Sequence, residues 1–183
     1  MKVLEILKLC NGMADLQLPE RYFAEQSDAL ADERITKLVY CCNSLLEQLY
    51  CDYATALKKC TLVATDGFAD TSGFDFNRVV SLVDSNGNNV RYRYTKGGLS
   101  VADGTYTLTY ASLPQRVGWT EEVEMPSPRI TPRIFAYGCL AEYFFSVGDV
   151  GQSSLWNDKF LNALKTANVK KSTMTMPPVG RWL

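Results

Sequence analysis

The chain of 183 residues contains no histidine. Without histidine, Ser-His-Asp and Cys-His catalytic arrangements cannot form, and the commonest general base near neutral pH is missing. The sequence also has no Gly-rich phosphate loop of the Walker type, and no Gly-x-Gly-x-x-Gly segment follows an expected strand. These absences argue against an enzyme. We expect neither a cofactor nor a metal.

Long apolar runs are absent as well. A membrane span needs roughly 18 uninterrupted apolar residues, and the nearest candidate, residues 134–147, is broken by Gly138 and Glu142. The segment Met1–Cys10 contains Glu5 and Lys8 and is not followed by a small-residue cleavage site, so it does not predict a signal peptide. We therefore expect a protein that is made in the cytoplasm and has no membrane partner.

The six cysteines do not form a metal-binding pattern. Cys41 and Cys42 are adjacent, so their side chains would leave a helix about 100° apart instead of converging on one ion. Nothing indicates secretion, and most of the cysteines lie in helical pattern, so buried reduced thiols are expected in place of disulfides. The six are Cys10, Cys41, Cys42, Cys51, Cys60 and Cys139.

The net charge of −1 is unevenly distributed. The segment Lys159–Leu183 has five basic residues and no acids, which leaves 14 basic and 20 acidic residues before it. Two interpretations of the basic terminus stay open: a solvated end, or an arm that docks on an acidic neighbouring subunit. The acidic balance of the rest disfavours sequence-specific DNA binding.

Helical periodicity predicts a bundle made of one long N-terminal helix and two C-terminal helices. The long helix is expected from Glu33 to about Tyr53, because its apolar residues recur at steps of three and four. Thr131 followed by Pro132 predicts the start of a second helix that runs to about Val147. The third is expected at about Ser153–Thr166, and a short helix at Val3–Leu9 precedes them all.

Between the long helix and the second one, the period changes to two. Apolar and polar residues alternate from about Val79 to Tyr110, and Asn86-Gly87, Gly97-Gly98 and Asp103-Gly104 supply turn residues between the runs. This pattern predicts an antiparallel β-meander of three or four short strands, with Thr61–Ala64 as a candidate addition. The fold class is therefore α+β.

A proline-rich loop, residues 112–130, follows the strands. It holds Trp119 and the acidic pair Glu121 and Glu122, and its prolines exclude regular structure over most of its length. Loops of this length are commonly functional, so two interpretations stay open: a packed connection, or an interface loop formed by Trp119, Glu121 and Glu122. Paired carboxylates could in principle serve glycosidase chemistry, but neighbouring acids in such a loop are far more often a solvated charge run.

Several segments together resemble the head-to-tail connector (adaptor) proteins of tailed bacteriophages. The likeness covers about Asp32 to Leu164 and is carried by helical segments around the β insertion. These segments are Ala31-Asp32-Glu33 leading into Leu45–Tyr53, then Phe135–Tyr143 with its Ala-Glu-Tyr motif, Gly148, and Trp156–Phe160.

The resemblance implies a subunit of the virion neck that is made in the host cytoplasm. Such subunits form a ring, usually a dodecamer, which binds the portal protein above and downstream tail proteins below, and DNA passes through without sequence-specific binding. In this family the C-terminal arm commonly engages the portal, although the arm of this chain is not part of the matched segments. The implied partner-binding residues are Lys170, Lys171, Met174, Met176, Pro177, Pro178, Arg181, Trp182 and Leu183.

The resulting organisation is a single adaptor-like domain at residues 1–168, with a β-rich insertion at about 61–111, followed by an extended C-terminal arm at 169–183. The function expected is that of a structural virion protein. A protein- or ligand-binding module outside any virion is the alternative, and an enzyme that uses cysteine or carboxylate chemistry is a third and weaker one.

Overall fold

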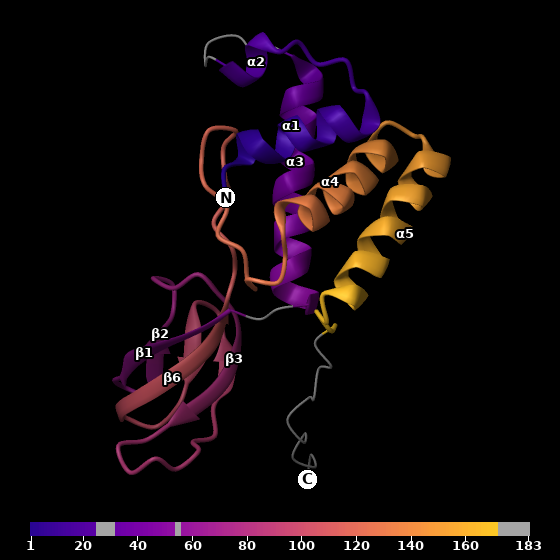
Figure 1. Cartoon of the computed structure of the whole chain (residues 1–183). Coiled ribbons are helices and arrows are strands. Elements are labelled where there is room, and N and C mark those ends of the chain that lie inside the picture. The colour runs from indigo at the N-terminus through magenta and orange to yellow at the C-terminus, as the bar shows by residue number, and fades with distance from the viewer. Residues whose placement is uncertain (25–31, 54–55, 172–183) are drawn as a thin grey trace.

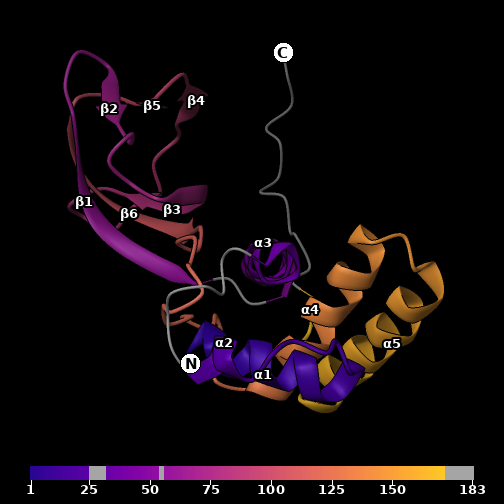
Figure 2. The ribbon, with the colours of Figure 1, turned by 90° about the horizontal axis from the view of Figure 1, so that it is seen from above.

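The computed structural model describes residues 1–24, 32–53 and 56–171. Its helices and strands confirm a mixed α+β chain, in which a helical body and a β unit lie on different sides of the molecule (Figures 1 and 2). The elements in chain order are α1 (Val3–Ala14), α2 (Arg21–Ala24), α3 (Glu33–Gln48), the π-helix η2 (Leu49–Tyr53), β1 (Leu57–Ala64), β2 (Phe68–Asp70), β3 (Phe76–Val83), β4 (Arg93–Thr95), β5 (Gly98–Ser100), β6 (Gly104–Ser112), α4 (Pro132–Ser146) and α5 (Val150–Thr166).

The long N-terminal helix begins where the sequence predicts it. Asp32 caps α3 by accepting a hydrogen bond from the Arg34 amide at 2.9 Å, and the Arg34 guanidinium pairs with the same carboxylate at 2.7 Å. The hydrogen bond from Arg34 lowers the pKa of Asp32. The regular α-helix ends at Gln48, and the last five residues of the expected span form η2.

The boundaries of two other helices differ from the sequence prediction. Helix α1 continues past Leu9 to Ala14, because Asn11 and Gly12 fit inside it and the chain leaves the helix only at Asp15, which has a φ of 46°. Helix α5 begins at Val150 instead of Ser153, since Asp149 caps it by accepting a hydrogen bond from the Gln152 amide at 3.0 Å.

The prediction of a single β-meander is wrong. The strands form two antiparallel sheets in the orders β1-β6-β3 and β2-β5-β4, so the first strand of the insertion pairs with its last strand. The register begins with Leu57 opposite Ala111, and the Ser112 amide donates to the Ala56 carbonyl at 3.0 Å. Both ends of an inserted unit must return to the same place on the helical body, and pairing its terminal strands achieves this.

The buried side chains form two separate clusters. In the helical body, α3 and α1 pack against α4, and α5 covers α4 through Trp156, Phe160 and Leu164 (Figure 2). Helices α3 and α4 approach closely because Gly138 has no side chain, and a Cβ there would lie 2.8 Å from the Leu45 methyl carbons. The β unit has its own cluster, in which Leu99 and Leu108 are fully buried.

Candidate interaction surfaces

The proline-rich loop is fixed to the helical body along its length. Asn43 of α3 binds the Val117 backbone twice: its amide nitrogen donates to the carbonyl at 2.9 Å and its oxygen accepts from the amide at 2.8 Å. Further along, the Tyr50 hydroxyl donates to the Glu124 carbonyl at 3.2 Å, and the Val3 amide donates to the Glu121 carbonyl at 3.0 Å. The loop therefore follows α3 and the start of the chain as an irregular but anchored segment.

Trp119 lies inside this packed connection. Its side chain is only 8% exposed and belongs to the hydrophobic cluster of the helical body. The indole is therefore not available as an apolar handle for another molecule. Glu121 and Glu122 are exposed, and one carboxylate oxygen of Glu121 accepts from the Gly118 amide at 2.9 Å. An interface role for this loop stays a prediction, and it would rest on the two glutamates.

Replacing Asn43 with Ala should release the middle of the loop. The substitution removes both bonds to the partly buried Val117 backbone, and each lost hydrogen bond typically costs about 0.5–1.5 kcal/mol. We expect a loss of about 2 kcal/mol in the free energy of unfolding, measured by urea denaturation, with the largest rise in hydrogen exchange at residues 115–121. Asn162→Ala, at an exposed position of α5, is the control. An equal loss in both variants would contradict the assignment.

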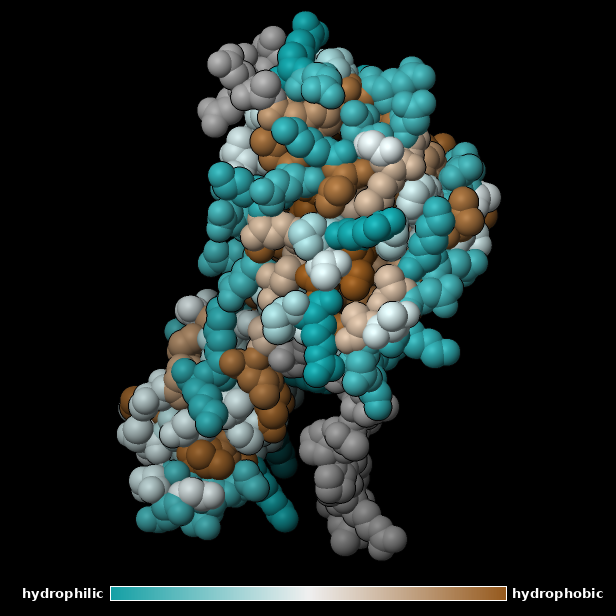
Figure 3. All heavy atoms as spheres, viewed as in Figure 1, coloured by the Kyte–Doolittle hydropathy of each residue, from teal (hydrophilic) through white to brown (hydrophobic). Residues whose placement is uncertain are grey.

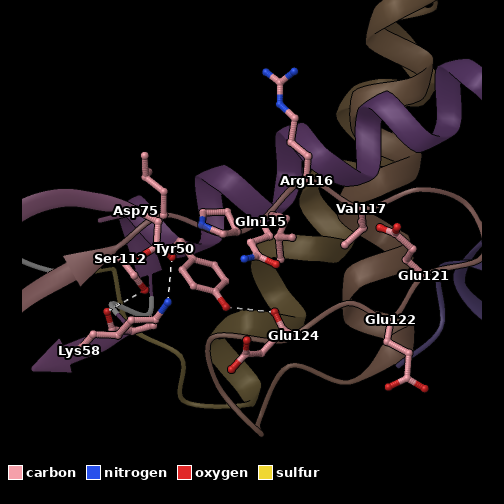
Figure 4. Close-up of a pocket in the computed structure, with 14 residues that line it drawn as sticks. Tyr50, Lys58, Asp75, Ser112, Gln115, Arg116, Val117, Glu121, Glu122 and Glu124 are labelled. Carbon is pink, nitrogen blue, oxygen red and sulfur yellow. Dashed lines mark hydrogen bonds and ion pairs between the residues drawn. The ribbon is translucent and has the colours of Figure 1, made fainter. Parts of the chain in front are cut away.

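A cleft of about 400 Å³ lies where the loop passes between the helical body and the β unit (Figure 4). One wall is apolar and comes from α3, η2 and the loop, with Leu46, Tyr50, Leu113, Pro114 and Val117. The other groups at the cleft are polar. They are Lys58, Asp75, Ser112, Gln115, Arg116, Glu121, Glu122 and Glu124, with Ala56 beside them.

The charges of this cleft are unbalanced. Lys58 and Asp75 neutralise each other through an ion pair of 2.8 Å, which raises the pKa of Lys58. Arg116 is exposed, and in Figure 4 its guanidinium points away from the labelled carboxylates. The three glutamates of the loop, all exposed, therefore outnumber the remaining cation. This charge favours a basic ligand or a basic segment of protein.

Apolar side chains are exposed around the turn between α4 and α5. Phe145 is 70% exposed, Val150 is 67% exposed and Val147 is 46% exposed. A groove of about 310 Å³ beside them is lined by Phe145, Val150, Glu142 and four small or polar residues of the same two helices. Apolar side chains also reach the surface of the β unit, among them Leu57, Val63 and Val80, and the face in Figure 3 shows brown patches over both parts.

Glu142 is held more weakly than its position on an apolar helix suggests. The sequence predicts a tie to a backbone amide or an arginine, whereas the structure shows the Ser44 hydroxyl donating to its carboxylate at 3.5 Å. The carboxylate borders the exposed groove between α4 and α5, so solvent can provide its remaining hydrogen bonds.

Only the first part of the expected C-terminal arm lies within the described residues. Lys170 is exposed, and Lys171 forms an ion pair of 3.4 Å with Asp52 and lies 5.9 Å from the centre of the Tyr53 ring. The chain therefore leaves the helical body beside η2. The other predicted arm residues lie outside the described residues: Met174, Met176, Pro177, Pro178, Arg181, Trp182 and Leu183.

Four of the six cysteines have raised pKa values and therefore offer little nucleophilic character. Burial raises the pKa of Cys41 to about 12, and burial also raises the pKa of Cys51 and of Cys60. Cys139 is buried with its Sγ atom 2.9 Å from that of Cys42, and contact with the thiols of Cys10 and Cys42 raises its pKa. Thiols with raised pKa values stay protonated near neutral pH, whereas the thiolate is the reactive form.

Within the described ranges, no group of three or more cysteine, aspartate or glutamate side chains could hold a metal ion. In the same part of the chain, no helix has the length and apolar character to cross a bilayer. No protein-family model matches the sequence, and no curated protein matches it.

Proposed function

We propose that this chain is a structural virion protein, a head-to-tail adaptor whose copies form a ring between the portal and the tail of a bacteriophage. The proposal takes the chain as a helical bundle that carries a β unit and ends in an extended C-terminal arm. It rests on the resemblance of residues 32–164 to connector proteins and on the surfaces described above.

One observation supports it above the others: Phe145, Val147 and Val150 are exposed together at the α4–α5 turn. Clustered apolar side chains of this kind commonly mark contacts between proteins. In a closed ring each subunit uses one face against a different face of its neighbour, and the groove between α4 and α5 would serve as one such face.

The test is reconstitution. The purified chain is mixed with the proteins encoded by its neighbouring genes, with the portal as the expected partner, and imaged by electron microscopy. Rings of the chain, alone or on the portal, are expected. The proposal would be overturned by a monomer that does not bind the portal or by a measured turnover reaction. Virions that lack the chain and still join heads to tails normally would also overturn it.

Deleting Ser172–Leu183 should abolish portal binding while the shortened chain still folds. The helical body and the β unit each have a hydrophobic cluster of their own among the described residues, so the shortened chain should keep a cooperative thermal unfolding transition. Binding is measured by co-sedimentation with the portal. Binding at the level of the full chain would contradict the role of the arm.

The alternative, a protein- or ligand-binding module outside any virion, is favoured by the cleft of about 400 Å³ at the junction with the β unit. This volume falls in the lower part of the range of small-molecule sites. A strictly monomeric protein that purifies with a ligand in this cleft would favour the module over the adaptor.

A further inference from the structure

We propose that the cleft between the helical body and the β unit is the docking site of this chain's own C-terminal segment, Ser172–Leu183, in the free subunit. The proposal goes beyond the adaptor function and does not depend on a ring or a portal. If the chain is an adaptor, the cleft and the portal would compete for the same segment.

The position where the described chain ends makes the cleft accessible. Lys171 is held beside η2 by its ion pair with Asp52, and Tyr50 of the same π-helix forms part of the cleft wall. The remaining 12 residues reach at most roughly 40 Å when extended, at about 3.3 Å per residue. An α-helix with its side chains is only about 10–12 Å wide, so the segment can pass around α3 and reach the cleft.

The composition of Ser172–Leu183 matches both the acidic side and the apolar wall of the cleft. It carries one charged side chain, that of Arg181, and this is basic, whereas loop glutamates outnumber the free cation at the cleft. A guanidinium pairs well with carboxylates. Trp182 and Leu183 follow directly, and they supply apolar surface for the wall formed by Leu46, Tyr50 and Val117.

The covalent connection selects the chain's own segment over that of another copy. A segment tethered by a short linker is present at an effective concentration in the millimolar range, well above the micromolar concentrations of dilute protein. Even weak binding of Arg181 and Trp182 to the cleft therefore favours docking of the chain's own segment over docking of another copy's segment.

Hydrogen exchange of the full-length protein tests the proposal. We expect amides of residues 172–183 to be protected, together with those of residues 113–124. The variant Glu122→Lys/Glu124→Lys changes two cleft carboxylates for which no side-chain hydrogen bond is described, and it leaves the Glu121 contact with Gly118 intact. Replacing two attractions by repulsions should speed exchange of residues 172–183 roughly tenfold or more.

The control is Glu20→Lys/Asp158→Lys, which changes the net charge equally at exposed positions that do not line the cleft, and it should keep the protection. Arg181→Glu should lose protection alone and regain it when combined with Glu122→Lys/Glu124→Lys. The proposal would be overturned if the amides of residues 172–183 are unprotected in the wild-type protein. It would also be overturned if their protection is unchanged in Glu122→Lys/Glu124→Lys. Protection that rises with protein concentration would assign the cleft to another copy's segment and overturn docking within one chain.

Discussion

Phe135→Ala is expected to lower the free energy of unfolding by about 3–5 kcal/mol, the usual range for removing a fully buried phenylalanine. The Phe135 side chain is completely buried and lies on α4, the helix that contacts α1, α3 and α5. Its removal opens a cavity between elements that share one cluster, and each of them loses contacts. Most small domains have a total stability of only about 5–15 kcal/mol, so this variant should fold poorly near 37 °C.

Phe145→Ala is the matched control, because it makes the same chemical change ten residues later on the same helix. The Phe145 side chain is 70% exposed, so the unfolding midpoint in urea should barely move. If the adaptor proposal holds, this variant should instead weaken ring formation, which sedimentation at increasing concentration would reveal. Equal losses of stability in the two variants would contradict the burial described for α4.

Gly98→Ala is expected to disrupt the smaller sheet, at a cost of about 3 kcal/mol or more, at or above the usual range for overpacking. A Cβ at Gly98 would collide with the Ala69 carbonyl oxygen and the Phe68 ring. An aromatic ring can rotate away, but the carbonyl belongs to β2, which pairs with β5 through Ala69 opposite Leu99. Relief of the collision therefore requires the two strands to move apart.

The loss should be local to the β unit at first. Hydrogen exchange should rise at residues 68–70 and 98–100, while α3 and α4 keep their protection, because the two parts have separate hydrophobic clusters. Gly73→Ala is the control, since a Cβ there meets nothing within 4 Å. Unchanged exchange at residues 68–70 in Gly98→Ala would show that the close approach of β2 and β5 is not as described.

Local sequence signals were reliable where one residue controls one boundary. Thr131 with Pro132 begins α4, as predicted from its capping chemistry, and α3 begins at Glu33 as predicted, with Asp32 as its cap. Turn residues were also informative: Gly87, Gly97 and Gly104 all have positive φ values. The start of α5 was missed because both Asp149 and Ser153 can cap a helix, and the sequence does not show which of them the packing on α4 favours.

The candidate surfaces were harder to predict than the helices. The acidic pair of the loop was recognised, but the cleft beside it was not, because its walls come from α3, η2, β1 and the loop together. Asn43 also gave no signal, since an asparagine in a helical pattern does not reveal that it binds a backbone segment 74 residues away. Trp119 shows a related limit: the sequence left a packed connection and an interface loop open, and only the structure shows that its side chain is buried in the core.

The sequence by itself determined the α+β class, the order of a long helix, a β-rich region and two C-terminal helices, and the absence of histidine chemistry. These properties depend on composition, on periodicity and on caps that act within a few residues. Tertiary structure alone decided that β1 pairs with β6, that Trp119 faces inward and that a cleft opens at the base of the β unit. The alternation of apolar and polar residues determines which face of a strand is apolar. Which strand it pairs with depends on the path of the whole chain.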